Sequence, residues 1–187
     1  MKKILILQGH PRKDSLVNAL TQAYYDGAKA MGFDVELIHL IDLNFDLILR
    51  EKDQALEPDL KMMQQKIKSA DHLVISYPMW WATMPALVKG FIDRVFLTGF
   101  AFHYKGKFPE GLLKGKSARY IMTMDSPAFL YKLLQGGPGF KIINRSILKF
   151  SGFSPIKRSA FYSVRASTQE KRTKWLEQMN ALGRKGI

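Results

Sequence analysis

The sequence predicts a three-layer α/β sandwich, in which a five-stranded parallel sheet of strand order 2-1-3-4-5 has helices on both faces. Two observations predict this class. Short apolar runs of strand length alternate along the chain with segments whose apolar residues recur at helical spacing, which is typical of parallel sheets. Five such runs in 187 residues fit one domain, 1–187, of the doubly wound type.

The first strand is expected over Lys3–Gln8, because Ile4–Leu7 is a continuous apolar run followed by Gly9. A helix is expected over Ser15–Met31, with Gly32 in the position of a C-terminal cap. Its apolar or small residues at helical spacing are Leu16, Leu20, Ala23, Gly27 and Met31.

Val35–Leu40 predicts the second strand, and an irregular linker, Asp42–Glu57, follows it. Pro58 suits the first turn of a lysine-rich helix that extends to Ser69. Leu73–Tyr77 is a third apolar run and predicts another buried strand.

Pro85 begins the next helix, and Tyr120–Met124 predicts the fourth strand. The apolar stripe of that helix is Leu87, Val88, Phe91, Ile92 and Val95. A helical stretch around Ile147 ends before Gly152.

Ile156–Val164 predicts the fifth strand. The last helix is expected over Thr168–Leu182, with Thr168 as its N-cap and Gly183 as its stop. In such a sheet, ligands bind beyond the carboxyl ends of the strands, near the first and third. The loops 8–15, 78–84 and 124–131 are therefore the candidate site.

The composition limits the classes of function. There is no cysteine, which excludes thiol catalysis and disulfides and is compatible with the cytoplasm. The four histidines lack ligand spacing, so no metal site is expected. The net charge of +13 suits nucleic acid, an anionic membrane surface or anionic small molecules. Because the basic residues are scattered, we interpret them as a solvated surface and expect no nucleic-acid partner.

The first loop, Gly9–Asn18, joins a strand to a helix N-terminus, where free N–H groups favour an anion. Ser15 adds a hydroxyl, and Arg12 and Lys13 add charge. The loop lacks a dinucleotide or Walker pattern, so a monophosphate suits it better. A plain N-cap with solvated basic residues is the alternative.

The second loop, Tyr77–Pro85, places Trp80 and Trp81 side by side at the end of a buried strand. Large aromatic residues in such a surface loop usually cover a ligand or a partner. The loop therefore predicts a site for a flat heteroaromatic ring. The alternative is that the two tryptophans cover the hydrophobic core or pack in a dimer interface.

The segments Gly9–Leu20 and Tyr77–Phe96 together resemble the NAD(P)H:quinone oxidoreductase family of flavodoxin-like flavoproteins. The family includes drug-modulator quinone reductases and ancillary subunits of potassium efflux systems. The resemblance extends over nearly the whole chain. It implies a flavodoxin-like fold, bound FMN (with FAD as the alternative), NAD(P)H as electron donor and a quinone-like acceptor.

The resemblance also implies roles for individual residues. The flavin-binding positions are His10, Arg12, Ser15, Leu16, Val17, Asn18, Pro78, Met79, Trp80, Trp81, Ala82, Thr123, Met124, Asp125, Ser126 and Tyr131. Tyr131 and Trp81 are the expected catalytic residues. Asp125 and Ser126 replace glycines of the family loop, and Gly137 stands where some relatives have a histidine.

Phe102 and Tyr104 match aromatic residues that reach over the partner subunit's flavin, which implies a homodimer. The expected activity is two-electron hydride transfer from NAD(P)H to a quinone by a ping-pong mechanism. The alternatives are a regulatory flavoprotein subunit with a peripheral membrane partner, and a one-electron carrier of flavodoxin type. The high positive charge argues against the last, because such carriers are typically acidic.

Overall fold

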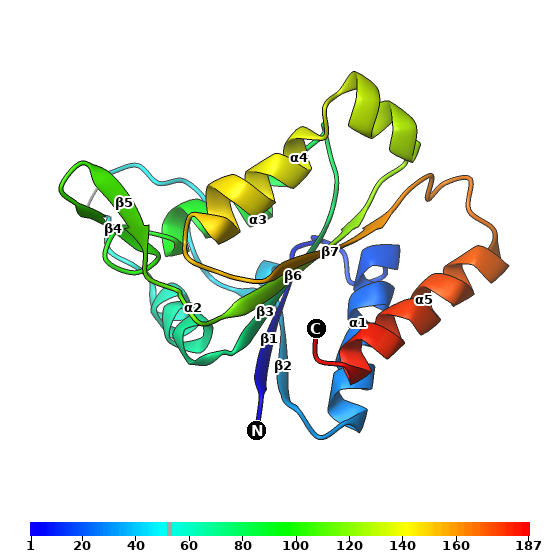
Figure 1. Cartoon of the computed structure of the whole chain (residues 1–187), viewed down its shortest axis with the longest axis horizontal. Helices are drawn as coiled ribbons and strands as arrows, with labels where there is room; N and C mark the ends of the chain where they lie inside the picture. Colours follow the sequence, from blue (N-terminus) through cyan, green and yellow to red (C-terminus); the bar gives the residue numbers. More distant parts are fainter. Residues whose placement is uncertain (52–53) are drawn as a thin grey trace.

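The computed structural model describes residues 1–51 and 54–187, so positions 52 and 53 of the expected linker lie outside the described residues. Its centre is a five-stranded parallel sheet of order β2-β1-β3-β6-β7, which is the order 2-1-3-4-5 among the strands of that sheet (Figure 1). The predicted fold class is therefore confirmed. The strands are β1 (Lys3–Gln8), β2 (Asp34–His39), β3 (His72–Pro78), β6 (Ser117–Thr123) and β7 (Ile156–Phe161).

Helices cover both faces of this sheet. On one face lie α1 (Leu16–Ala30) and α5 (Gln169–Arg184), which pack against each other. On the other face lie α2 (Pro58–Ser69), α3 (Ala86–Val95) and the continuous segment formed by α4 (Pro138–Lys141) and the π-helical η3 (Ile142–Lys149). Among the described helices, none has both the length and the apolar content that crossing a bilayer requires.

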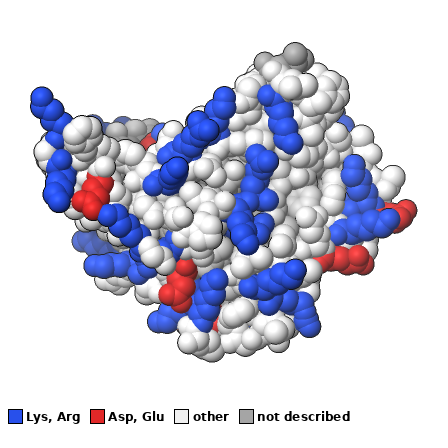
Figure 2. Space-filling model, viewed as in Figure 1, with Lys and Arg blue, Asp and Glu red and all other residues white. Residues whose placement is uncertain are grey.

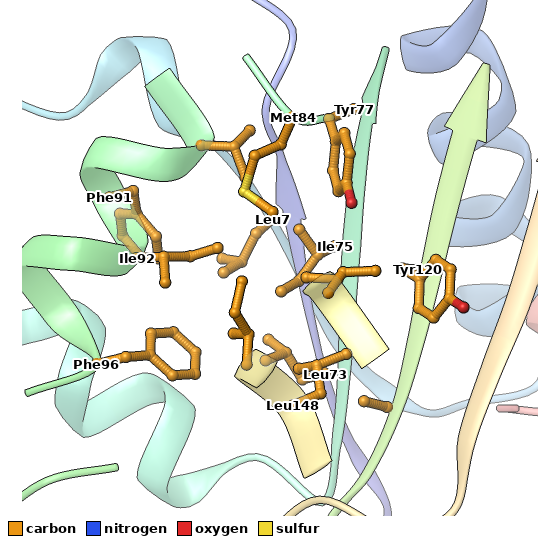
Figure 3. Packing of buried hydrophobic residues seen from close by; sticks show 14 of the residues in the cluster. Leu7, Leu73, Ile75, Tyr77, Met84, Phe91, Ile92, Phe96, Tyr120 and Leu148 are labelled. Carbon is orange, nitrogen blue, oxygen red and sulfur yellow. The ribbon is translucent and has the colours of Figure 1, made fainter. Parts of the chain in front are cut away.

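The inner strands β1, β3 and β6 are buried on both faces, which explains their apolar runs, whereas the edge strands β2 and β7 are only partly buried. Along β1, Ile4 and Ile6 pack with α1 and α5, whereas Leu5 and Leu7 pack with α2 and α3. Figure 3 shows the second of these cores, where Leu7 lies among side chains from the neighbouring strands and α3. Two cores therefore hold the sheet rigidly and fix the positions of the loops at its carboxyl edge.

Three features of the strands differ from the sequence expectations. The strand expected over Tyr120–Met124 begins earlier, at Ser117, and the one expected over Ile156–Val164 ends earlier, at Phe161. An antiparallel hairpin, β4 (Phe102–Lys105) and β5 (Phe108–Gly111), was not predicted.

The expected helix stop at Gly183 is wrong, because Gly183 lies inside α5. A Cβ atom there would come within 2.0 Å of the Tyr24 carbonyl oxygen on α1. At Gly27 on α1, an added Cβ would lie 2.2 Å from the Asn180 carbonyl oxygen on α5. The two glycines let the helix backbones approach closely, so Gly183 is a packing residue. Gly32, in contrast, has φ +76° and follows α1 as a cap, as predicted.

Candidate functional site

A cavity of about 320 Å³ opens at the carboxyl edge of the sheet, where β1, β3, β6 and β7 end. This volume is within the range of small-molecule sites. The cavity draws together residues from the three predicted loops and one from a fourth. Its lining residues are His10, Arg12, Asp14, Ser15, Leu16, Val17, Pro78, Met79, Trp80, Thr123, Met124, Asp125 and Val164.

One end of the cavity is the N-terminus of α1. Ser15 is the N-cap, and its Oγ accepts a hydrogen bond from the Asn18 N–H at 3.3 Å. The N–H groups of Leu16 and Val17 are the first two of the helix, so they have no carbonyl partner within it. Because both residues line the cavity, these donors and the Ser15 O–H favour an anion there. The plain cap and the anion site are thus compatible: the hydroxyl oxygen caps while its proton remains a donor.

His10 is buried beside this end, and its hydrogen bonds fix its tautomer. The Arg12 N–H donates to His10 Nδ1 at 2.9 Å, so the proton of the neutral ring is on Nε2. Burial and the nearby Arg12 charge lower the pKa of His10, which favours this neutral form. Gln8 Oε1 accepts a hydrogen bond from the backbone N–H of His10 at 3.2 Å, which helps to fix the position of the residue. His10 is therefore a neutral N–H donor near neutral pH.

The charged groups around the α1 end are partly paired. Arg12 Nε lies 3.7 Å from Asp14 Oδ1, and Lys13 Nζ lies 2.6 Å from Asp42 Oδ2. All four side chains are largely exposed, so these pairs are screened by water and hold the loop only weakly. They leave the backbone amides and His10 as the more rigid donors.

The other end of the cavity is formed by the loop after β3, which folds into a two-residue hairpin. Trp80 and Thr83 exchange N–H···O bonds of 2.9 and 3.0 Å. Trp81 and Ala82 between them have φ +49° and +62°, the backbone of a type I′ turn that usually needs Asn-Gly. The left-handed conformation costs roughly 1–2 kcal/mol for each residue with a Cβ. Such strain is concentrated at functional sites.

The hairpin exposes the two tryptophans to different degrees. Trp80 is half exposed, lines the cavity and meets His10 edge-on, with ring centroids 5.6 Å apart. Trp81 is at the tip and fully exposed. The Met79 N–H donates to the Thr123 carbonyl at 2.7 Å, which ties this loop to the one after β6. This side of the cavity is therefore lined by an aromatic ring and by backbone.

Tyr131 lies behind the hairpin and is 1 % exposed. Its hydroxyl donates to the Ala82 carbonyl at 3.1 Å and accepts the Gly139 N–H at 2.8 Å. Burial raises the pKa of the hydroxyl, so it stays protonated. Tyr131 thus contacts the site through the hairpin that it holds.

Most of the expected site residues are brought together, and some are not. The expected residues outside the cavity lining are Asn18, Trp81, Ala82, Ser126 and Tyr131. Phe102 and Tyr104 lie on β4 instead, where their rings meet edge-on at 5.8 Å. Phe102 lines a separate cavity of about 340 Å³ between α3 and η3.

The expectation omitted Asp14 and Val164. Asp14 stood in the predicted first loop. The sequence pattern placed Val164 in the fifth strand. In the structure β7 ends at Phe161, so Val164 lies in the loop that follows it, at the same edge of the sheet as the end of β6. The Val164 N–H donates to the Met124 carbonyl at 3.2 Å, and the Arg165 N–H donates to Asp125 Oδ1 at 2.7 Å. The loop after the fifth strand thereby supports the loop after the fourth.

Comparisons with known proteins support the fold. The family model described as "Flavodoxin-like fold" matches residues 2–182. The NAD(P)H dehydrogenase [quinone] 1 of Cavia porcellus is 26% identical over 203 residues, which cover 94% of this chain and 74% of that protein.

Solved structures are also similar. The Smu.1420 protein of Streptococcus mutans UA159 has a TM-score of 0.88 and 31% identity, with 98% of this chain and 99% of that one covered. An FMN-dependent NADH-azoreductase from Bacillus anthracis str. Ames Ancestor, crystallised with FMN, has a TM-score of 0.82 and 18% identity. It covers 99% of both chains, and at this identity it supports the fold alone. The chain belongs to the family of proteins with the flavodoxin-like fold.

Proposed function

We propose that this protein is a flavin-dependent NAD(P)H oxidoreductase that reduces quinone-like acceptors, with residues 1–187 acting as one flavin-binding domain. The observation that carries the proposal is a cavity with an anion-binding helix terminus at one end and the strained Trp80–Thr83 hairpin at the other. A phosphorylated cofactor with a flat ring needs both ends. The quinone dehydrogenase named above supports the reaction class.

The residues present fit FMN. Its phosphate would meet the Ser15 hydroxyl, the N–H groups of Leu16 and Val17, and His10 Nε2–H. The ring would lie along Met79 and Trp80 and the loop that begins at Thr123. When bound, flavin supplies the hydride chemistry that the side chains lack.

The protein's own residues then position the reactants. The neutral His10 donates without adding a full charge, while Arg12 supplies positive charge at the cavity mouth. Trp81 is fully exposed at the hairpin tip, outside the cavity lining, where it would flank reactants placed against the bound ring. In a ping-pong mechanism NAD(P)H and the acceptor would use this position in turn. Tyr131 holds the hairpin in place, and its direct catalytic role stays a prediction.

We further propose that the protein is cytoplasmic and forms a homodimer. Tyr104 is exposed on β4 and Phe102 lines the groove between α3 and η3, so a second copy that used this groove could bring both aromatic residues over its partner's site. The absence of cysteine supports the compartment.

A regulatory flavoprotein subunit of a membrane potassium-efflux system is the second candidate, and the strongly basic surface supports it. A one-electron carrier is the third, and the same charge opposes it. The first two differ in whether the bound flavin turns over with a free acceptor.

The test is an anaerobic titration of the FMN-loaded protein, followed by its visible absorption. We expect NADPH or NADH to bleach the flavin and a soluble naphthoquinone to restore the colour. Bound flavin that neither nucleotide bleaches would favour the regulatory subunit. A protein that retains no flavin would contradict every flavin-based role.

A further inference from the structure

The basic residues are spread along the chain, but one stretch of it lacks the acidic residues that elsewhere offset their charge. Residues 126–169 contain no Asp or Glu, although the chain has 16 acidic residues in all. The basic residues in this stretch are Lys132, Lys141, Arg145, Lys149, Lys157, Arg158 and Arg165. The cavity chemistry above uses none of their charged side chains, so this charge needs its own explanation.

The fold arranges part of this charge in a row. Lys141, Arg145 and Lys149 recur at every fourth position of α4–η3 and are exposed, while Ile143 and Ile147 of the same segment are buried against the sheet. Within the described residues, none of the three belongs to an ion pair. Figure 2 shows blue side chains over this part of the surface without red ones among them. The row is an uncompensated basic stripe.

Two exposed apolar side chains project near the ends of the stripe. Leu133 is 79 % exposed on the turn η2 (Leu130–Leu134), next to Lys132. Phe108 is 78 % exposed at the start of β5, next to Lys107. In Figure 1 the β4–β5 hairpin and the turn that precedes α4 project at opposite ends of α4–η3. Each projection therefore combines a large apolar tip with a neighbouring lysine.

We propose that this face, consisting of the row Lys141, Arg145 and Lys149 with the tips Phe108 and Leu133, docks on an anionic lipid surface. A bilayer offers a plane of negative headgroups for the row and an apolar layer just beneath for the tips. A nucleic-acid duplex offers phosphates but no such layer. A second copy placed symmetrically on the row would set like charges against each other.

The first test is sedimentation of the whole protein with phosphatidylcholine vesicles, with and without phosphatidylglycerol. We expect binding only to the anionic vesicles, and weaker binding as salt rises. The triple variant K141A/R145A/K149A should bind on the order of 100-fold more weakly, at roughly fivefold for each basic residue lost.

The matched control is K29A/R184A/K185A. It removes the same residue types and the same charge from exposed positions of the α1–α5 layer, on the other face of the sheet. It should retain binding. Equal losses in the two triple variants would mean that net charge alone drives binding, and would overturn the proposal.

The second test detects insertion of the tips. Because the chain has no cysteine, Leu133→Cys, Phe108→Cys and, as a control, Ala30→Cys on α1 can each be labelled with an environment-sensitive dye. Anionic vesicles should blue-shift the first two dyes and leave the third unchanged.

Three results would overturn the lipid assignment. The first is no binding to anionic vesicles. The second is a blue shift of the dyes at the tips in the absence of vesicles, because that would indicate a protein–protein contact. The third is tighter binding to a short DNA duplex than to vesicles. None of these readouts needs the cofactor, so the inference can fail or succeed independently of the proposed reaction.

Discussion

The hydroxyl of Tyr131 lies 3.1 Å from the carbonyl oxygen of Ala82 and donates a hydrogen bond to it. The same hydroxyl accepts the Gly139 N–H, so it joins the start of α4 to a turn held in a left-handed conformation. A Cβ atom on Gly139 would lie 2.7 Å from both oxygens, which shows how closely the three groups meet. The strained hairpin is thus stabilised from behind by one side chain.

Replacing Tyr131 with Phe should loosen this hairpin. The change leaves the Ala82 carbonyl and the Gly139 N–H without their partner, at a cost of about 1–3 kcal/mol in the free energy of unfolding. We expect faster hydrogen exchange at the Trp80 and Thr83 amides in the flavin-free protein, and weaker FMN binding.

The control for this change is Tyr77→Phe, because the buried Tyr77 hydroxyl has no hydrogen-bond partner among the described residues. It should leave exchange and stability nearly unchanged. If Tyr131→Phe slowed flavin reduction but left exchange of the hairpin amides unaltered, Tyr131 would act on the reaction directly rather than by positioning.

Replacing Ser15 with Ala should weaken both the helix and the anion site. Ser15 caps α1 by accepting from the Asn18 N–H, and Thr168 caps α5 in the same way by accepting from the Lys171 N–H. Each loss should lower the free energy of unfolding by about 1 kcal/mol. Only Ser15→Ala should also weaken FMN binding, measured by fluorescence titration. Equal FMN affinity in the two variants would mean that Ser15 is a cap alone.

Replacing Gly183 with Ala should force α1 and α5 apart. The added methyl group would meet the Tyr24 backbone rather than a flexible side chain, so we expect a loss of about 1–3 kcal/mol of stability in urea unfolding. Gln178→Ala, at an exposed position of the same helix, should cause no loss. If Gly183→Ala raised stability, as at an ordinary helix position, the close approach would be wrong.

Stability should fall in mild acid because of His72. Burial and the charges of Lys2, Arg119 and Lys157 lower the pKa of His72 from 6.5 to about 3. As the pH falls below 6.5, the unfolded chain takes up the proton first, so the free energy of unfolding falls by up to about 1.4 kcal/mol per pH unit. The loss of stability from His72 stops increasing once the pH falls below the pKa that His72 has in the folded protein.

His72→Leu should flatten this slope between roughly pH 6.5 and 5, above the range where most carboxyl groups titrate. The slope is measured by urea unfolding of both proteins at several pH values. His103→Leu, a change of the same type at a half-exposed ring, should keep the slope. An unaltered slope in His72→Leu would assign the acid sensitivity to other groups.

The sequence by itself determined the strand order and the loops that carry the site. Apolar runs such as Ile4–Leu7 are local patterns, and a parallel sheet with two covered faces is the arrangement that buries them. Because the strands are parallel, their carboxyl ends meet at one edge, so the loops after β1, β3 and β6 had to converge. Most of the cavity lining followed from this.

Tertiary structure alone decided the contacts between distant residues. Gly183 has the sequence signature of a helix stop, but its proximity to Tyr24 makes it a packing position. Three contacts join segments far apart in the chain: the bond from the Tyr131 hydroxyl to the Ala82 carbonyl, the support that Arg165 gives to Asp125, and the position of Phe102 beside η3. Local propensity carries no information about such pairs, because their energy exists only once the two cores have brought the segments together.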